Sequence, residues 1–306
     1  MKNFRALLQL PVFIFLFVSI GSAQAEIAES SECRKADYDC RIAELTRKIE
    51  QGPAVSELYR LRGYLYYGKS DYQNSKKDYL KAINLDDKNG KAYAGIGDIY
   101  SVWSSYDRAI IKYSQAIERD PNDVEFYQYR ARVYVLKGDY QSAIRDYDKG
   151  IEIEPDKFAL YGHRGALLER LGKVKESQDA YRLVIKKITE TIEAKPLGEQ
   201  KAAFAEFYLI RGMNYVRVNE REKAIADFSR GMELDEDYDD LYFFRGITLS
   251  ELKEFSKALS DFSKALELTP EYAEVFKYRA TVYRSIGDRE KMSADLEKFN
   301  ELTKKP

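Results

Sequence analysis

The clearest apolar pattern in the chain runs through the 34 residues from Val124 to Lys157. Two stretches, 127–134 and 143–150, place apolar or small residues three and four positions apart, which puts them on one face of a helix. The residues Gly138 and Asp139 separate the two stretches, and Pro155 follows the second. The pattern therefore predicts a helix, a tight turn and a second helix ended by proline. Because such a hairpin cannot bury both apolar faces by itself, it needs neighbours.

The same pattern recurs along the chain. Counting from the first residue of each unit, an aromatic residue stands at position 4, and a small residue stands at position 8, where the two helices must approach closely. The aromatic residues are Tyr59, Tyr93, Tyr127, Tyr161, Tyr208, Tyr242 and Phe276. The small residues are Gly63, Gly97, Ala131, Gly165, Gly212, Gly246 and Ala280. Successive members lie 34 residues apart, except that Tyr161 and Tyr208 are 47 apart.

The second predicted helix repeats as well, with a ring at position 24 in six units: Tyr79, Tyr113, Tyr147, Tyr181, Phe228 and Phe262, with Leu296 in the seventh. This set of positions, from Ser56 to Pro306, resembles the tetratricopeptide-repeat (TPR) family. The resemblance implies an all-α fold, a right-handed superhelical solenoid of about seven helix-turn-helix repeats. The chain departs from the family at position 4, where Tyr or Phe replaces Trp, and at position 7, where Arg mostly replaces Leu.

The arginines at position 7 have acidic counterparts at position 23. The arginines are Arg62, Arg130, Arg164, Arg211, Arg245 and Arg279, and the acids are Asp78, Asp146, Asp227, Asp261 and Asp295. In the second repeat both are absent together, as Ile96 and Lys112. We expect an ion pair between the two helices of each such repeat, bidentate because the guanidinium and carboxylate forks match. Arg164 has Ala180 at the matching position, so the fourth repeat should lack the pair.

The chain divides into five segments: a signal peptide (1–25), a cysteine-bearing segment with a capping helix (26–55), repeats one to four (56–191), an insertion (192–204) and repeats five to seven (205–306). The insertion adds 13 residues to the period and extends helices on both sides of the Pro196 and Gly198 break. It is either a tolerated insertion, or a partner contact or a change of superhelix pitch. In the last repeat, Ser293 and Asn300 replace apolar residues, as a terminal repeat requires.

The first 25 residues have the features of an export signal. Lys2 and Arg5 precede an apolar run from Leu7 to Ile20, and Ala23-Gln24-Ala25 forms an A-x-A cleavage site. We expect cleavage after Ala25 and a mature protein without a membrane span, in the periplasm or secreted. The alternative is an uncleaved membrane anchor, for which the apolar run is short.

The chain has two cysteines, Cys33 and Cys40. An oxidising compartment favours a disulfide between them. On one continuous helix their Cα atoms would lie about 10.5 Å apart, which is too far, so a bond requires a bend between Lys35 and Asp39. The alternative is two free thiols.

The sequence offers no arrangement for catalysis, a cofactor or a metal. His163 is the sole histidine and occupies position 6 of a first helix, which is typical of packing. The glycines are spread along the repeats rather than gathered in a phosphate-binding loop. Many of the 25 tyrosines fall on core positions, among them Tyr79, Tyr113 and Tyr147. The net charge is −1, which argues against a nucleic-acid partner.

The remaining functional feature is a surface. In the TPR family the first helices line a concave groove through positions 2, 5, 9 and 12. Transferred to this chain, the polar front part comprises Arg60, Tyr64, Tyr67, Lys91, Asp98, Gln128 and Arg132, and the apolar rear part comprises Leu209, Met213, Val216, Phe243 and Ile247. The carboxylate clamp that some TPR domains use is absent, since Tyr64 and Asp98 occupy position 9.

We therefore expect a non-catalytic, exported scaffold that binds a peptide or protein segment in this groove, in envelope complex assembly or secretion. An apolar rear groove left exposed would mark a binding surface. The alternative is a structural, homo-oligomeric repeat protein that self-associates through that groove and the inserted hairpin.

Overall fold

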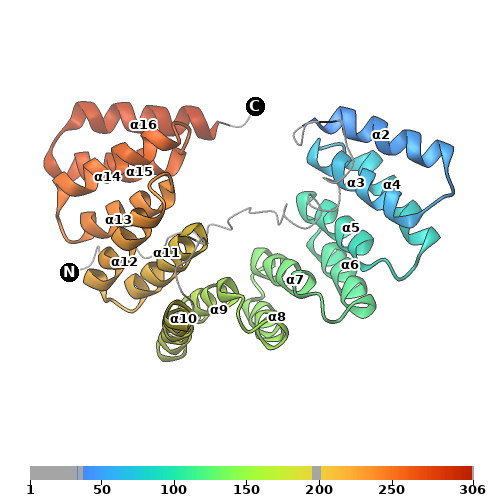
Figure 1. Ribbon diagram of the computed structural model, residues 1–306, viewed down its shortest axis with the longest axis horizontal. Coiled ribbons are helices and arrows are strands. Elements are labelled where there is room, and N and C mark those ends of the chain that lie inside the picture. Colours follow the sequence, from blue (N-terminus) through green and yellow to red (C-terminus); the bar gives the residue numbers. More distant parts are fainter. Residues whose placement is uncertain (1–32, 34–36, 195–200, 305–306) are drawn as a thin grey trace. The chain divides into compact units, whose positions relative to one another are not determined.

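The computed structural model describes residues 33, 37–194 and 201–304. Over these residues the chain consists of helices joined by short turns, with no strand (Figure 1). The expected all-α repeat solenoid is thus confirmed. The predicted signal peptide (1–25) and the Pro-Gly break of the insertion lie outside the described residues.

The chain forms two compact units, Met1–Leu171 and Gly172–Pro306. The described helices of the first unit are α2 (Tyr38–Gln51), α3 (Ser56–Gly68), α4 (Tyr72–Leu85), α5 (Gly90–Val102), α6 (Tyr106–Arg119), α7 (Val124–Lys137), α8 (Tyr140–Ile153) and α9 (Phe158–Arg170). Those of the second unit are α10 (Val174–Ala194), α11 (Lys201–Arg217), α12 (Arg221–Leu234), α13 (Asp239–Glu251), α14 (Phe255–Leu268), α15 (Ala273–Ile286) and α16 (Arg289–Thr303). Within each unit, consecutive helices pack as hairpins, and each hairpin packs on the next.

Every hairpin turns through a residue with positive φ at position 15. Gly138, Gly172 and Gly287 adopt this left-handed conformation, and Ser70, Ser104, Asn219 and Lys253 adopt it in the other four repeats. Aspartate then caps three of the following helices: Asp71 caps α4, Asp139 caps α8 and Asp288 caps α16. The same left-handed backbone conformation therefore recurs at position 15 in all seven repeats, although glycine marks it in only three.

The small residue at position 8 faces the ring at position 24 of the same hairpin. A Cβ atom added to Gly97 would lie 2.9 Å from the Tyr113 ring, and one added to Gly246 would lie 2.8 Å from the Phe262 ring. These distances are shorter than van der Waals contact, so a larger residue would push the helices apart. The close approach predicted from the small residues is confirmed at these positions.

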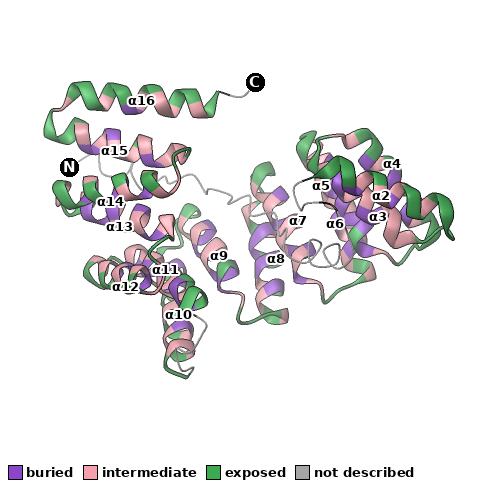
Figure 2. Cartoon of the chain, turned by 45° about the horizontal axis from the view of Figure 1, so that its top comes forward, coloured by how far each residue is buried: buried purple, intermediate pink, exposed green. Residues whose placement is uncertain are grey.

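The ring residues at position 24 form the centre of the fold. Tyr79, Tyr113, Tyr147, Tyr181, Phe228 and Phe262 are all buried, with at most 3% of their surface exposed. Buried residues lie along the helix sides that meet neighbouring helices, whereas exposed residues gather at turns and outer faces (Figure 2). The assignment of these tyrosines to the core is confirmed.

The lengthened helices of the predicted insertion are present. Helix α10 has 21 residues and α11 has 17, where the other second and first helices of the repeats have 13 to 15. The extension changes where α11 packs along α10. Arg211 of α11 donates a hydrogen bond to Thr189, which lies seven residues, or two helical turns, beyond the position that the repeat period gives.

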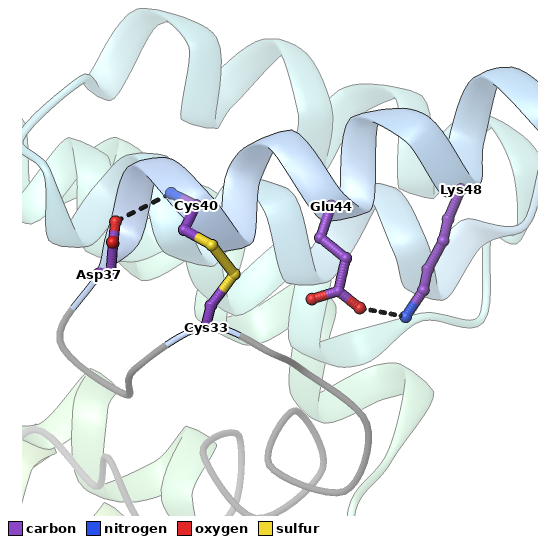
Figure 3. The surroundings of a disulfide bond; sticks show 5 residues. All are labelled: Cys33, Asp37, Cys40, Glu44 and Lys48. Atoms are coloured by element: carbon purple, nitrogen blue, oxygen red, sulfur yellow. Dashed lines mark hydrogen bonds and ion pairs between the residues drawn. A yellow bond between two sulfur atoms is a disulfide. The ribbon is translucent and has the colours of Figure 1, made fainter.

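A disulfide closes the N-terminal segment: Cys33 and Cys40 are bonded, with their Cα atoms 5.8 Å apart (Figure 3). This is feasible because α2 begins only at Tyr38, so Cys33 precedes the helix. Asp37 caps the helix by accepting a hydrogen bond from the backbone N–H of Cys40 at 2.9 Å. At its other side α2 buries Leu45 against Leu61 and Leu65 of the first repeat.

At the opposite end of the array, α16 presents a polar outer side. Ser293 and Asn300 are exposed, and together with Leu296, Glu297, Glu301 and Lys304 they line a shallow depression. Within α16, Asp295 alone is buried, because it pairs with Arg279. This polar side has the composition expected where stacking ends.

The arginines at position 7 pair with the aspartates at position 23 as predicted. In five repeats the Nε and Nη2 groups donate to both carboxylate oxygens, at 2.7 to 2.9 Å: Arg62 with Asp78, Arg130 with Asp146, Arg211 with Asp227, Arg245 with Asp261, and Arg279 with Asp295. The carboxylates are buried and the guanidinium groups half-buried.

Each of these arginines also contacts the preceding helix, which the sequence reading did not anticipate. The third nitrogen, Nη1, donates at 2.8 to 3.5 Å to a hydroxyl group there: Thr46, Ser114, Thr189, Ser229 or Ser263. One guanidinium therefore joins three helices, two of its own repeat and one before it. In four of the five repeats the signal was a Ser or Thr 16 residues before the arginine; in the fifth, Thr189 lies 22 residues before Arg211 because of the insertion. Thr46 shows that α2 takes the place of a preceding second helix.

Two repeats depart from this arrangement. In the second repeat, Ile96 replaces the arginine and is buried, and Leu80 stands where the preceding helix would carry the hydroxyl group. In the fourth repeat, Arg164 pairs instead with Asp148 of the preceding helix α8. Arg164 thus bonds to the helix before it, and position 23 of its own repeat is Ala180, which has no carboxylate.

We predict that Asp146→Asn lowers the free energy of unfolding by about 2 kcal/mol, because the half-buried Arg130 loses the charge of its partner. Lys149→Gln on the same helix is the control. It removes the exposed pair with Glu152 and should cost less than about 0.5 kcal/mol. Urea unfolding followed by circular dichroism measures both, and equal losses would contradict the role given to the buried pair.

Candidate functional site

The predicted groove residues of the first unit differ in how far they are exposed. Arg60 is buried, and its Nε donates to the Glu57 carboxylate at 2.8 Å. Lys91 is exposed, whereas Tyr64, Tyr67, Asp98, Gln128 and Arg132 are half-buried. These side chains come from α3, α5 and α7, the first helices of three successive repeats. We call their surface, together with the matching positions of α9, the first-helix face of the first unit.

Arg132 belongs to a polar cluster with Tyr67, Asp98 and His163 of this face, and the cluster extends to the buried ring of Tyr147 of α8, on which His163 stacks. Its positive charge acts on the pKa of each of the other four members. These members come from α3, α5, α8 and α9, so four repeats contribute to one site. Residues far apart in the sequence are therefore brought together by stacking.

Asp98 is the acidic group of the cluster. Burial raises its pKa to about 6, and this rise is opposed by a hydrogen bond from Tyr113 and by the charge of Arg132. The Tyr113 hydroxyl donates that bond at 2.6 Å. Burial also raises the pKa of Tyr67, and the charge of Asp98 adds to the effect. The carboxyl group thus changes its charge near neutral pH, which an exposed aspartate does not.

His163 is the neutral member of the cluster. Burial and, to a smaller extent, the charge of Arg132 lower its pKa to about 4. Its ring stacks on that of Tyr147, with centroids 5.5 Å apart and an angle of 25° between the planes. The histidine is therefore uncharged at pH 7 and packs on an aromatic ring. This placement agrees with the packing role expected from its position in the repeat.

The expectation of an exposed apolar groove in the second unit is wrong. Leu209 and Phe243 are each only 5% exposed. Leu209 packs with Phe228 and Leu241, and Phe243 lies among the rings of Phe262, Tyr272 and Tyr278. Position 5 here faces neighbouring helices rather than solvent. A repeat pattern gives the face of a helix but not how completely the next repeat covers it.

The other predicted rear residues, Met213, Val216 and Ile247, are half-buried and pack against the same two cores. A hydrogen-bonded pair that the sequence reading missed lies beside them. Tyr272 donates to Asp240 at 2.5 Å, and burial raises the pKa of that carboxyl group. These contacts join α13 to the start of α15.

The part of the chain that the structure describes contains no group of three or more His, Cys, Asp or Glu residues that could hold a metal ion. No helix in the same residues is both long and apolar enough to cross a membrane.

We predict that Asp98→Asn stabilises the fold at pH 7.5 but not at pH 4. The pKa of Asp98 is raised from 3.8 to about 6 in the folded state, so its ionisation weakens the fold as pH rises through this interval. Replacing it by the neutral amide should add about 1–2 kcal/mol above pH 6. Thermal unfolding at several pH values measures this gain. The exposed Asp87→Asn is the control, and an equal, pH-independent effect of both variants would contradict the assignment.

Comparison with known proteins identifies the repeats. Models described as tetratricopeptide repeat match residues 56–89, 90–123, 205–238 and 239–272, and a further one matches 112–145. A model described as TPR repeat matches 131–172. Comparison with proteins of curated function gives no match.

Solved structures show the same fold. A tetratricopeptide repeat protein from Parabacteroides merdae is 19% identical with a TM-score of 0.57, over 86% of this chain and 99% of that one. Yeast Tom70 is 17% identical with a TM-score of 0.63, over 89% of this chain and 56% of that one. The APC/C hetero-tetramer Cut9-Hcn1 is 13% identical with a TM-score of 0.54, over 79% of this chain and 46% of that one. With its repeated hairpins and matching family models, this chain belongs to the tetratricopeptide-repeat family.

Proposed function

We propose that this protein is a non-catalytic interaction scaffold that holds a peptide or protein segment on the first-helix face of its first unit. The observation that carries the proposal is the polar cluster around Arg132. Tyr67, Asp98, Arg132 and His163 come from four successive repeats, are each half-buried, and offer hydrogen-bond donors and acceptors. An extended or helical segment of another protein matches such a site in length and chemistry.

The proposal extends to the place where the protein works. Export to the periplasm or beyond the cell is supported by the signal-like residues 1–25 and by the disulfide between Cys33 and Cys40. Disulfides persist in oxidising compartments and are rare in the reducing cytosol. Assembly of envelope complexes and secretion are the processes that such a scaffold would serve.

We predict that the protein produced in its natural host begins at Glu26 and that reduction raises its mass by two hydrogen atoms. The first result follows from cleavage after Ala25, and the second from the disulfide. Cell fractionation with intact-mass spectrometry measures both. A chain that retains Met1 in the membrane fraction would support the uncleaved anchor instead, and a chain in the cytosol with two free thiols would contradict export.

We predict that a Tyr64→Ala, Gln128→Ala double variant loses most of the partner proteins that the mature chain captures from an envelope extract of its host. Both side chains are half-buried on the first-helix face, so their removal takes away contacts without exposing the core. Quantitative mass spectrometry of the captured proteins measures the loss, which should reach about tenfold for specific partners.

The matched control is Arg145→Ala with Lys149→Ala, two exposed positions of α8. It should capture the same proteins as the parent, and circular dichroism should show that both variants keep their helices. Equal capture by the parent and the Tyr64, Gln128 variant would remove the first-helix face from the proposal.

Self-association remains the alternative function. Of the two features it was expected to use, the apolar rear groove and the inserted hairpin, the first is not exposed. It required an exposed apolar surface, and Leu209 and Phe243 are instead part of the core. Light scattering of the mature chain distinguishes the two functions. A monomer at all concentrations favours the scaffold, and a dimer that forms with rising concentration favours self-association.

A further inference from the structure

The outward sides of α4 and α6 carry cations that no carboxylate neutralises. The buried residues of these two helices face α3 and α5, so the residues between them along each helix turn outward. The outward residues are Lys76, Lys77, Leu80 and Lys81 of α4, and Arg108, Ile111 and Lys112 of α6. We call this surface the α4/α6 outer face. None of its five cations forms an ion pair with a residue in the described part of the chain.

Four other second helices neutralise the outward cation at position 26 with a glutamate three residues later. These pairs are Lys149 with Glu152, Arg230 with Glu233, Lys264 with Glu267, and Lys298 with Glu301. In α4 the residue three after Lys81 is Asn84, and in α6 position 26 is Gln115. The carboxylates of α4 and α6 have other partners: Asp78 pairs with Arg62, Asp107 with Lys137, and Glu118 with Arg119. The positive charge of the α4/α6 outer face is therefore uncompensated.

The cations of the two helices share one aromatic ring of α5. The charged groups of Lys76 and Arg108 lie 4.8 and 5.8 Å from the centroid of the Tyr100 ring. Lys76 also lies 5.5 Å from the centroid of Trp103, which is 37% exposed. These contacts hold cations of α4 and α6 in one surface and place the sole tryptophan of the chain at its border.

An exposed leucine stands among these cations. Leu80 and Lys112 occupy the positions that Ser114 and Asp146 occupy one repeat later, where both bond to Arg130. Because one guanidinium reaches both positions there, the same stacking places Leu80 beside Lys112. The side chain of Leu80 is 48% exposed. The second repeat, which lacks the arginine, carboxylate and hydroxyl group, thus presents an aliphatic group between lysines.

We propose that the α4/α6 outer face binds the surface of a lipid bilayer that contains anionic headgroups. Leu80 and Ile111, the latter 56% exposed, enter the boundary between the headgroups and the acyl chains. The five cations lie among the headgroups around them. The inference does not depend on the proposed peptide site, because that site is formed by first helices and this face by second helices. A bilayer bound here leaves the first-helix face open to a partner protein.

The composition of the face favours a bilayer over an acidic protein or a nucleic acid. Four of the five cations are lysines, and their flexible stems suit mobile headgroups, whereas a fixed carboxylate is matched best by an arginine fork. Lysine stems also cover apolar surface while the charge stays in the headgroup layer. Nucleic-acid bases stack on open aromatic rings, but Tyr100 already has cations beside its ring.

The test mixes the mature chain, which begins at Glu26, with large unilamellar vesicles. This chain is used so that the apolar run 7–20 cannot contribute to binding. One set of vesicles contains only phosphatidylcholine, and the other contains equal parts of phosphatidylcholine and phosphatidylglycerol. Co-sedimentation measures the affinities. We expect binding to the anionic vesicles to be at least about tenfold tighter and to weaken as salt is added.

Trp103 provides a direct report on the face, because the chain contains no other tryptophan. We expect its fluorescence emission to shift to shorter wavelength when anionic vesicles bind, since the indole ring leaves water. Acyl chains that carry bromine should quench this emission. Neutral vesicles should leave it unchanged.

Lys77→Gln with Lys81→Gln should weaken binding to the anionic vesicles at least about tenfold. The matched control is Lys149→Gln with Lys264→Gln, which removes the same charge from exposed or half-buried lysines that have glutamate partners. The control should leave the affinity within about twofold of the parent, because these charges are already neutralised.

Leu80→Ser with Ile111→Ser should weaken binding by about fivefold or more, because the apolar groups that enter the bilayer are lost. The matched control is Leu183→Ser with Ile286→Ser, two side chains of the second unit that are 42% and 48% exposed. It should bind as the parent does. Circular dichroism checks that each variant is folded.

Selective binding that both variants weaken and their controls do not supports the site. Equal losses in the variants and their controls overturn it, because total charge or hydrophobicity would then decide binding. Equal affinity for both kinds of vesicle, no binding to either, or an unchanged Trp103 emission on bound vesicles also overturns it. Soluble polyglutamate is the remaining probe. If it binds as tightly as the anionic vesicles and loses affinity in the lysine variant, the face serves an acidic protein rather than a bilayer.

Discussion

A single guanidinium that joins three helices is the interaction on which this repeat architecture depends. Apolar packing holds adjacent helices together, but it tolerates sliding, because one apolar side chain can replace another along a helix face. The bidentate pair between Arg130 and Asp146 has no such freedom, and the bond from Arg130 to Ser114 extends the constraint to the preceding repeat. The same set of bonds in five repeats fixes the register within and between hairpins.

Two repeats lack this set of bonds, and each difference has a physical reason. In the second repeat the arginine, the carboxylate and the hydroxyl are all absent, and the buried Ile96 fills the space. A half-satisfied polar site would be less stable than an apolar one, so the three members change together. In the fourth repeat Arg164 bonds to Asp148 of the preceding helix only. The boundary between the two compact units falls directly after α9, the helix that carries Arg164, between Leu171 and Gly172.

Because core and ion-pair positions are fixed by packing, the first-helix face is where the repeats are free to differ. The first unit uses it for Tyr67, Asp98 and Arg132, which interact by charge and remain partly open to solvent. The second unit fills the corresponding space with Leu209 and Phe243, which are buried among neighbouring rings and aliphatic groups. One fold thus carries a polar face in one unit and a closed apolar core in the other, which is why we place partner binding in the first.

The sequence by itself determined the helices, the period, the family and the arginine-aspartate pairs, since each of these depends on residues 34 or fewer positions apart in a regular repeat. It also located the residues at positions 5 and 9. Only the tertiary structure decided which of them are accessible, because the burial of Phe243 depends on rings supplied by two further helices. It also revealed the hydroxyl partners on the preceding helix and the cluster of Tyr67, Asp98, Arg132 and His163. Both depend on how one hairpin stacks on the next, and the spacing of residues within a hairpin does not contain that information.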